Sequence, residues 1–428
     1  MTTPARATFA VVTMGCPKNE ADSDRLEAAL VRAGHRPAPT SAADLVLVNT
    51  CGFIDAAKEE SIAALLDACD DAHARSARVA AYGCLVARHG AELAAAIPEL
   101  DLVSPFDLGP VLDLLAGLEG RGGAGSLAAR TRARPLHAYL KISDGCDRCC
   151  AFCAIPLIKG TYETAAPRAV LAAAREALDR GARELVLVGQ DTTRWRALGY
   201  GGLERLLADL RELEPLWLRL MYLQPDGLTD AVLEALADFC VPYVDLPLQH
   251  ASGRVLRAMG RKGDAATHIA LLERVRVRLP GAALRSTFIV GYPGETDDDV
   301  EGLLDFVAAA ELAVAGVFVF DPQEGTRAAT LPGQVPPALR EERAARLGEA
   351  VAAASQRYWS SFVGRTVEVL VERGSRGVAT EVAGRIAEQA PDVDGLTWVA
   401  GARARRGQVI SAVVDDADGY HLSGQAVT

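Results

Sequence analysis

Apolar and polar positions alternate through most of the chain in a repeated strand–helix pattern. Short apolar runs predict strands, and apolar residues at helical spacing predict the helices between them. Strands that alternate with helices form parallel sheets covered on both faces. The first region, up to about residue 117, is therefore expected to be α/β with a parallel sheet. Its predicted strands are Phe9–Met14, Leu45–Asn49 and Arg78–Tyr82, and its predicted helices lie near 18–33, 55–71 and 85–96.

The same alternation continues from about residue 136 to residue 358. Six successive strand–helix units predict an open or partial (β/α) barrel, and a long helix near 337–357 ends the region. In such barrels the chemistry takes place at the carboxyl ends of the strands. The predicted strands are Ala138–Ile142, Glu184–Gly189, Trp217–Met221, Tyr243–Leu246, Leu284–Val290 and Ala313–Phe318.

The last region, about 359–428, loses the helical spacing. Short β-branched runs separated by Gly and Asp predict a small antiparallel β-barrel. These runs are Thr366–Glu372, Thr397–Ala400 and Val409–Val414.

The segment Gly117–Pro135 is rich in Gly and Arg and has no periodicity, so we interpret it as a linker. The sequence thus predicts three domains. They are an N-terminal α/β domain over 6–117, a partial barrel over 132–358 and a small β-barrel over 359–428.

Composition and charge narrow the class of protein. The formal net charge is −11, which weakly favours a basic protein partner over RNA, since phosphate contacts usually need a basic surface. We find no apolar run near the ~20 residues of a membrane helix and no signal peptide, so we expect a cytoplasmic protein without a membrane partner. In that compartment the nine cysteines are expected to bind metal or do redox chemistry rather than form disulfides.

Three cysteines follow the first predicted strand of the partial barrel. Cys146, Cys150 and Cys153 form a C-x3-C-x2-C pattern with Phe152 before the last one. Four thiolates saturate a four-iron cluster, so three leave one iron open. An open iron can chelate the amino and carboxylate groups of S-adenosylmethionine (SAM) and deliver an electron to its sulfonium.

Zinc binding is the alternative for this loop. Cys149 creates two overlapping C-x2-C pairs, and four thiolates in eight residues could hold zinc in a tetrahedron. The adjacent Cys149 and Cys150 would strain that tetrahedron, and structural zinc pairs are usually separated by a longer loop. We therefore favour an iron–sulfur cluster and predict that Cys149 is not a ligand.

Three further cysteines each follow an N-terminal strand and precede a helix. Cys16, Cys51 and Cys84 stand in the stretches TMGC, VNTC and AYGC. In a parallel sheet such positions share the carboxyl edge, where ligands bind, so they predict a second three-thiolate site. A purely structural role remains the alternative, because buried cysteines are common. We interpret Cys69 and Cys240, which lack this pattern, as ordinary core or surface residues.

The central cysteine pattern, the partial barrel and the stretch Phe288–Thr296 (FIVGYPGET) together resemble the radical SAM superfamily. The resemblance implies that the glycine-rich end of strand five, with Gly291 and Gly294, helps to seat SAM. Read alone, that stretch is only a turn before a helix. With the N-terminal cysteine trio and the small β domain, the whole chain is similar to the methylthiotransferases. That family implies an auxiliary four-iron four-sulfur cluster on the N-terminal trio and a substrate-binding C-terminal barrel like the TRAM module.

Three stretches resemble the members that modify an aspartate of small-subunit ribosomal protein S-twelve rather than adenosine in transfer RNA. They are Leu140–Cys146, Gly189–Thr193 and Ala390–Gly395. This type implies two SAM molecules, one donating methyl and one generating a radical at the aspartate β-carbon. It also implies an electron donor such as flavodoxin or ferredoxin and leaves the sulfur donor open. The alternatives are a transfer-RNA methylthiotransferase and a zinc-stabilised RNA-binding protein without enzymatic activity.

We assign no catalytic role to the other polar residues at predicted strand ends. His250, after Gln249, is interpreted as structural, and Asp191 and Glu295 are left unassigned because charged groups are common at barrel mouths. The chain lacks the G-x4-G-K-[ST], H-E-x-x-H and G-x-S-x-G patterns, which argues against a P-loop NTPase, a zinc protease and an α/β-hydrolase.

Overall fold

The computed structural model describes residues 7–118, 135–375 and 380–427. These residues form two compact units. The first comprises the described residues of Met1–Pro135, Gly145–Asp147 and Ala154–Tyr162, and the second comprises the described residues of Leu136–Asp144, Arg148–Cys153 and Glu163–Thr428. The predicted linker Gly117–Pro135 lies, apart from its ends, outside the described residues. None of the described helices combines the length and the apolar character needed to cross a membrane.

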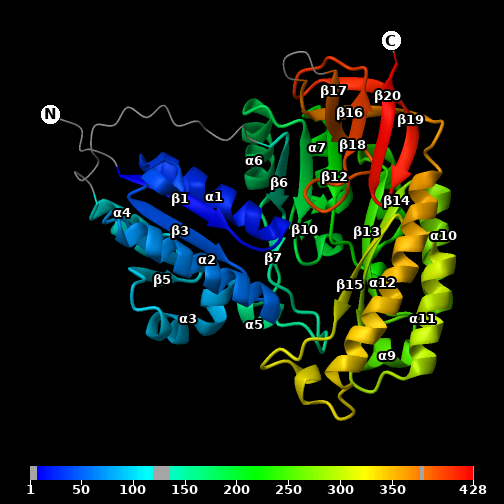
Figure 1. The fold of residues 1–428 in the computed structure, drawn as a ribbon, viewed down its shortest axis with the longest axis horizontal. Coiled ribbons are helices and arrows are strands. Elements are labelled where there is room, and N and C mark those ends of the chain that lie inside the picture. Colours follow the sequence, from blue (N-terminus) through cyan, green and yellow to red (C-terminus); the bar gives the residue numbers. More distant parts are fainter. Residues whose placement is uncertain (1–6, 119–134, 376–379, 428) are drawn as a thin grey trace. The chain divides into compact units, whose positions relative to one another are not determined.

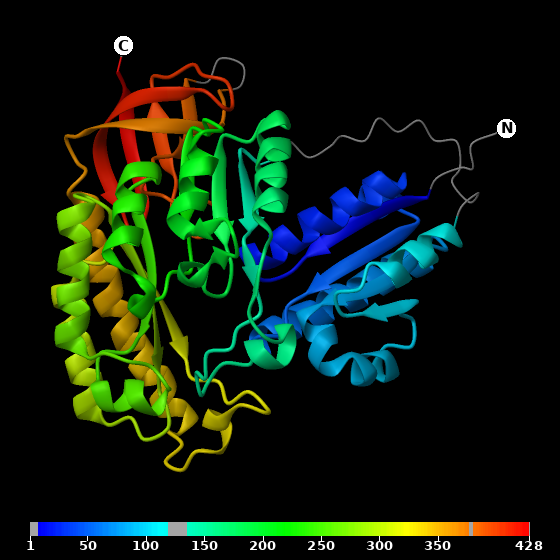
Figure 2. The same ribbon diagram turned by 180° about the vertical axis from the view of Figure 1, so that it is seen from behind.

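The first unit is a parallel sheet between two layers of helices (Figure 1, Figure 2). Its strands are β1 (Thr8–Thr13), β2 (Arg36–Pro37), β3 (Leu45–Thr50), β4 (Arg78–Gly83) and β5 (Leu102–Ser104), in the order β2-β1-β3-β4-β5. Its helices are α1 (Pro17–Ala33), α2 (Asp55–His73), α3 (Cys84–Ala96), α4 (Gly109–Ala116) and the short α5 (Ile155–Lys159). Successive residues of a strand point to opposite faces. Accordingly, Val46 and Val48 pack with α2 and α3, while Leu45 and Leu47 pack with α1 and α4.

The second unit begins with six parallel strands. They are β6 (His137–Lys141), β9 (Glu184–Val188), β12 (Trp217–Leu220), β13 (Tyr243–Gln249), β14 (Ala283–Val290) and β15 (Val314–Val319). They pair as two ladders, β12-β9-β6 and β13-β14-β15. Two backbone hydrogen bonds, from Val241 to Leu218 and from Leu223 to Asp245, join β12 to β13. Because β6 and β15 do not pair with each other in the described residues, the predicted partial barrel is confirmed.

Helices cover the outside of this partial barrel. They are α6 (Pro167–Asp179), α7 (Leu203–Arg211), α8 (Asp230–Phe239), α9 (Gly253–Ala258), α10 (Ala265–Arg278), α11 (Asp297–Ala310) and α12 (Pro337–Ser360). Buried residues of α6 to α8 and α10 to α12 form one apolar core with the strands. Short two-residue strands lie in the connections: β7 (Ser143–Asp144), β8 (Glu163–Thr164), β10 (Arg196–Ala197) and β11 (Gly201–Gly202).

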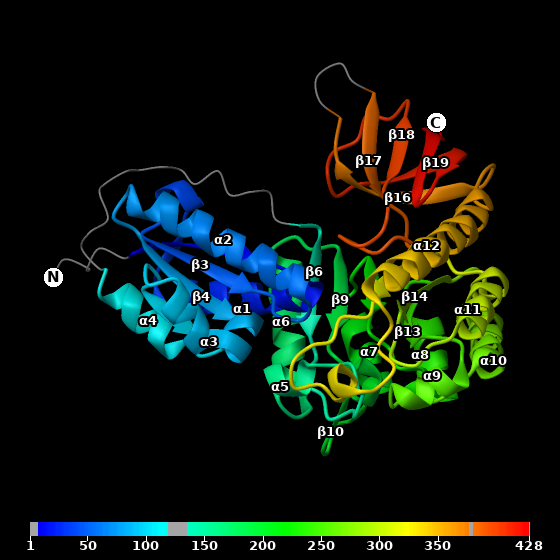
Figure 3. The ribbon, with the colours of Figure 1, turned by 60° about the horizontal axis from the view of Figure 1, so that its bottom comes forward.

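A closed five-stranded barrel follows α12 (Figure 3). Its strands are β16 (Thr366–Arg373), β17 (Glu381–Arg385), β18 (Thr397–Ala400), β19 (Val409–Asp418) and β20 (His421–Ala426). The predicted small β-barrel is confirmed, with one difference: β18 and β20 pair in parallel. Its apolar core continues into Trp217 and Tyr243 at the amino ends of two core strands. The barrel is therefore packed on the end of the core opposite to the carboxyl edge.

Candidate functional site

The three N-terminal cysteines lie where adjacent parallel strands end. Cys16 follows β1 as the residue before α1, Cys51 follows β3, and Cys84 opens α3 directly after β4. Since β1, β3 and β4 are neighbours in the sheet, the predicted convergence at the carboxyl edge agrees with the topology. Cys51 and Cys84 are buried, and Cys16 is half-buried.

Close backbone packing and one amide side chain hold these strand ends together. A β-carbon on Gly15 would lie 2.9 Å from Cys51 Sγ, so the loop before Cys16 lies directly against Cys51. Asn19 Nδ2 donates to the carbonyls of Met14, at 2.9 Å, and Thr50, at 3.2 Å. Its Oδ1 accepts from Cys84 Sγ at 3.6 Å. Asn19 thus contacts all three cysteine loops, a role that the sequence analysis missed.

Burial and a nearby positive charge act in opposite directions on the ionisation of these thiols. Burial raises the pKa of Cys51 and raises that of Cys84 to about 12. The ammonium of Lys159 acts in the opposite direction and lowers the pKa of Cys84. Lys159 Nζ is fixed by a 2.9 Å ion pair with Asp22 and lies 3.4 Å from the ring centroid of Phe106. Because a thiol must lose its proton to bind a metal, this cation would favour metal binding by Cys84.

The central cysteine loop follows β6 and β7. Cys146 belongs to the first unit, where its N–H donates to the Gly160 carbonyl at 3.1 Å. Gly145 has a φ of +64°, and a β-carbon there would lie 2.0 Å from the Thr161 carbonyl oxygen. Only glycine fits that position, so the turn into the cysteine loop is closely defined.

Cys150 and Cys153 belong to the second unit. Between them, the N–H of Ala151 donates to the Met259 carbonyl at 2.8 Å, and the Ala151 carbonyl accepts from Ala328 at 2.8 Å. These bonds tie the loop to the segments that follow α9 and β15. Cys149 is exposed, whereas Cys150 and Cys153 are half-buried.

Two arginines surround this part of the loop. Arg261 Nη1 donates to Cys150 Sγ at 3.8 Å. Arg148, beside Cys149, pairs with the fully buried carboxylate of Asp191 at 2.6 Å and with the partly exposed carboxylate of Asp226 at 2.9 Å. Burial tends to raise the pKa of Asp226, but Arg148 outweighs burial and holds it below its ordinary value. Asp191 therefore anchors the cysteine loop through Arg148.

Cysteine thiolates, the donors available at both sites, are the ligands that iron–sulfur clusters use. In the described ranges, no three Cys, His, Asp or Glu side chains converge on one point closely enough to share a single metal ion. In a four-iron cluster each thiolate binds a different iron atom, so the thiols need only border a common space. Three buried or half-buried cysteines at adjacent strand ends fit that requirement.

The glycine-rich turn after β14 has a structural explanation of its own. Gly291 has a φ of +75°, and a β-carbon there would lie 2.4 Å from Arg340 Cγ. Gly294 has a φ of +80° but faces only Arg254 Nη1, at 3.8 Å. Packing against Arg340 thus accounts for Gly291, while Gly294 borders open space. Their part in seating SAM stays a prediction.

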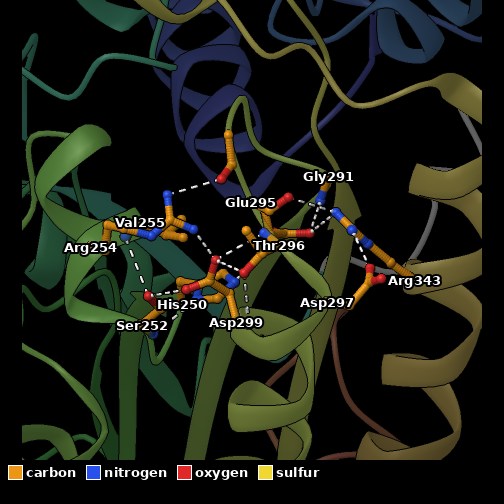
Figure 4. Close-up of polar contacts among 11 residues, drawn as sticks. His250, Ser252, Arg254, Val255, Gly291, Glu295, Thr296, Asp297, Asp299 and Arg343 are labelled. Atoms are coloured by element: carbon orange, nitrogen blue, oxygen red, sulfur yellow. Dashed lines mark hydrogen bonds and ion pairs between the residues drawn. The ribbon is translucent and has the colours of Figure 1, made fainter.

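A buried chain of polar side chains supports that turn (Figure 4). Glu295 Oε1 accepts from the N–H of Gly291 at 2.8 Å and from Arg343 Nη1 at 3.0 Å. Its Oε2 lies 3.3 Å from His250 Nε2, and both side chains are fully buried. His250 Nδ1 accepts from the N–H of Ser252 at 2.9 Å. The contacts agree with the structural role expected for His250 and give Glu295 a bracing role.

Family models match three segments of the chain. The Radical SAM superfamily model matches residues 140–307, the model described as Uncharacterized protein family UPF0004 matches 8–105, and the TRAM domain model matches 363–427. The chain is also similar to solved structures. The cobalamin- and cluster-bound radical SAM methyltransferase TsrM from Kitasatospora setae has a TM-score of 0.55 at 15% identity, covering 75% of this chain and 77% of TsrM. At that identity the likeness shows the fold.

Curated relatives are much closer in sequence. The ribosomal protein uS12 methylthiotransferase RimO of Anaeromyxobacter sp. strain K is 39% identical over 97% of this chain and 92% of its own length. RimO of Geotalea uraniireducens is 35% identical over the full length of both chains. Because these matches run through all three family segments, the chain belongs to the RimO family of radical SAM methylthiotransferases.

Proposed function

We propose that this enzyme methylthiolates the β-carbon of an aspartate in small-subunit ribosomal protein S-twelve (uS12). The observation that carries the proposal is the presence of two separate cysteine trios in a chain of this family. Cys16, Cys51 and Cys84 share one edge of the first sheet, while Cys146, Cys150 and Cys153 stand in the loop after β6. The names of the curated relatives supply the substrate.

Both trios are proposed to hold four-iron four-sulfur clusters. A cluster on Cys146, Cys150 and Cys153 would supply the electron that cleaves one SAM, and a cluster on Cys16, Cys51 and Cys84 would hold the sulfur that a second SAM methylates. The residues around each trio have corresponding tasks. Asn19 keeps the three strand-end loops in contact, and Asp191 positions the central loop through Arg148.

The glycine-rich turn is proposed to seat SAM at the carboxyl edge of the partial barrel. Gly294 leaves room for a ligand to approach the backbone, since no atom closer than 3.8 Å would meet a β-carbon there. Glu295 holds the turn in place by accepting the N–H of Gly291, and Arg343 neutralises its buried charge.

Several finer points belong to the same proposal. The net charge of −11 suits a basic ribosomal protein, and the TRAM-like barrel is the candidate substrate-binding domain. We propose the domain boundaries 6–117, 132–358 and 359–428, a cytoplasmic location beside the ribosome, and a flavodoxin or ferredoxin as electron donor. The sulfur donor stays unassigned.

Anaerobic reconstitution followed by mass spectrometry tests this function. The iron-loaded enzyme is incubated with SAM, dithionite and a sulfide source, and with either purified uS12 or unmodified transfer RNA. We expect a methylthio group on an aspartate of uS12 and no change in the RNA. Modification of adenosine in the RNA, with uS12 unchanged, would contradict the proposed substrate and select the transfer-RNA alternative.

A further inference from the structure

Arg261 makes a set of contacts that the proposed function does not use. It follows α9 in the loop that leads to α10, and its N–H donates to the Leu256 carbonyl at 2.7 Å. Its guanidinium donates to three acceptors in the second unit. These are Gln224 Oε1 at 2.6 Å, the Pro247 carbonyl at 2.8 Å and Cys150 Sγ at 3.8 Å.

The two oxygen acceptors fix the direction of the guanidinium. Gln224 is buried at 6% exposure, and Pro247 lies within β13, so both come from the rigid part of the core. The guanidinium is planar and permanently charged, so two bonds to it also set where its remaining N–H groups point. Both oxygen partners are neutral, and Asp226, a carboxylate that Arg261 influences electrostatically, is itself already paired with Arg148. The positive charge of Arg261 is therefore presented to the sulfur of Cys150.

We propose that Arg261 is a positioning residue for Cys150 that raises the reduction potential of the cluster on the central trio. The inference rests on the proposed function, because it takes Cys150 as an iron ligand. A donor to a ligand sulfur and a nearby positive charge both stabilise the more negative, reduced state of a cluster. With a cluster bound there, an electron from an external donor would enter it at a less negative potential.

A redox titration tests this inference without relying on turnover. The full-length chain with Cys16, Cys51 and Cys84 replaced by Ala serves as the parent, because it leaves one cluster to observe. Arg261→Gln removes the charge, Arg261→Lys keeps the charge without the planar geometry, and Arg257→Gln removes an exposed charge from the same helix region as a control. Each protein is reconstituted, assayed for iron and titrated with dithionite under electron paramagnetic resonance.

We expect all four proteins to hold the same iron. The midpoint potential of Arg261→Gln should be more negative than that of the parent, Arg261→Lys should fall between them, and Arg257→Gln should match the parent. An unchanged potential in iron-loaded Arg261→Gln would overturn the inference. Loss of iron from either Arg261 variant in a folded chain would also overturn it, because Arg261 would then be needed for ligation rather than for tuning.

The proposed function fails in a different way. If the parent itself binds no four-iron cluster, the assignment of Cys146, Cys150 and Cys153 as ligands is wrong, and the inference fails with it. If the parent is loaded with iron and only the shift is missing, the ligand assignment stands and the role of Arg261 alone is refuted.

Discussion

Glu184 at the start of β9 and Arg385 at the end of β17 form a buried ion pair of 2.7 Å between the partial barrel and the small β-barrel. Arg219 of β12 binds the other oxygen of Glu184 at 2.6 Å and donates to the Ala387 carbonyl at 2.9 Å. All three side chains are almost completely buried. The barrel is therefore attached to the core by charge as well as by apolar contact.

Replacing Glu184 by Gln is expected to destabilise the second unit by about 3–5 kcal/mol. The substitution leaves two buried guanidinium groups without their shared carboxylate, which costs far more than losing an exposed pair. Thermal or denaturant unfolding of the full chain measures the effect. Glu176→Gln is the control, since its ion pair with Arg180 is exposed and should change stability by less than about 1 kcal/mol. Equal effects of the two substitutions would contradict the assigned role of Glu184.

The same carboxylate predicts part of the acid sensitivity. Burial tends to raise the pKa of Glu184, but Arg219 and Arg385 outweigh burial and hold it below the ordinary value of 4.5. A depressed pKa contributes stability that is present above pH 4.5 and is lost as the pH falls through the folded-state pKa. Unfolding free energies measured at several pH values should therefore fall less steeply below pH 4.5 in Glu184→Gln than in the parent. If stability fell equally steeply with pH in both proteins, Glu184 would not contribute to the acid sensitivity.

Cys149 is predicted to be dispensable for the central cluster. Its side chain is exposed, and the C-x3-C-x2-C pattern is complete without it. Cys149→Ser should keep its iron and its reductive cleavage of SAM, whereas Cys150→Ser should lose both. Iron assay and chromatography of deoxyadenosine measure the two properties. Equal loss in both variants would show that Cys149 is a ligand.

Replacement by Ala should destabilise the fold by different amounts at Gly291 and at Gly294. Both have a positive φ, which costs a non-glycine residue about 1–3 kcal/mol. Gly291→Ala also places the methyl group against Arg340, whose guanidinium is held by the Phe320 and Val335 carbonyls and cannot easily move. Gly291→Ala should therefore lower the melting temperature more than Gly294→Ala. A larger drop in melting temperature for Gly294→Ala would mean that the Arg340 side chain moves aside easily.

The cluster count is a separate prediction. Two trios of cysteines imply close to eight irons per chain after anaerobic reconstitution, if each holds four irons. Replacing Cys146, Cys150 and Cys153 together by Ala should remove about half of that iron, and circular dichroism checks that the chain remains folded. A content near four irons in the unaltered protein would refute the second site.

The strands that precede the cysteines could be predicted from the sequence, because an apolar run and the cysteine after it are close together along the chain. β17 and β20 escaped prediction because EVAGR and HLSGQA have few strongly apolar residues and only pairing within the closed barrel makes them strands. The parallel pairing of β18 with β20 likewise depends on closure of the barrel.

The supporting residues of the sites could not be read from the sequence in the same way. Asn19 sits in an ordinary helical stretch, and its partners Thr50 and Cys84 come from other strands. Arg261 reaches Cys150 from a loop more than a hundred positions later in the chain. The stretch Ala390–Gly395 did indicate the family from the sequence. The structure shows what one of its residues contacts: Asp392 accepts from Tyr139 at 3.0 Å and pairs with His137 at 3.1 Å.

The division of labour between the two cysteine trios is the central claim, and one comparison tests it most directly. Deoxyadenosine and methylthio-aspartate on uS12 are measured side by side in the parent and in two variants, one with Cys16, Cys51 and Cys84 replaced by Ala and one with Cys146, Cys150 and Cys153 replaced by Ala. Circular dichroism confirms folding. The N-terminal variant should form deoxyadenosine without transferring methylthio, and the central variant should do neither. Full methylthio transfer by a folded N-terminal variant would contradict the two-cluster account.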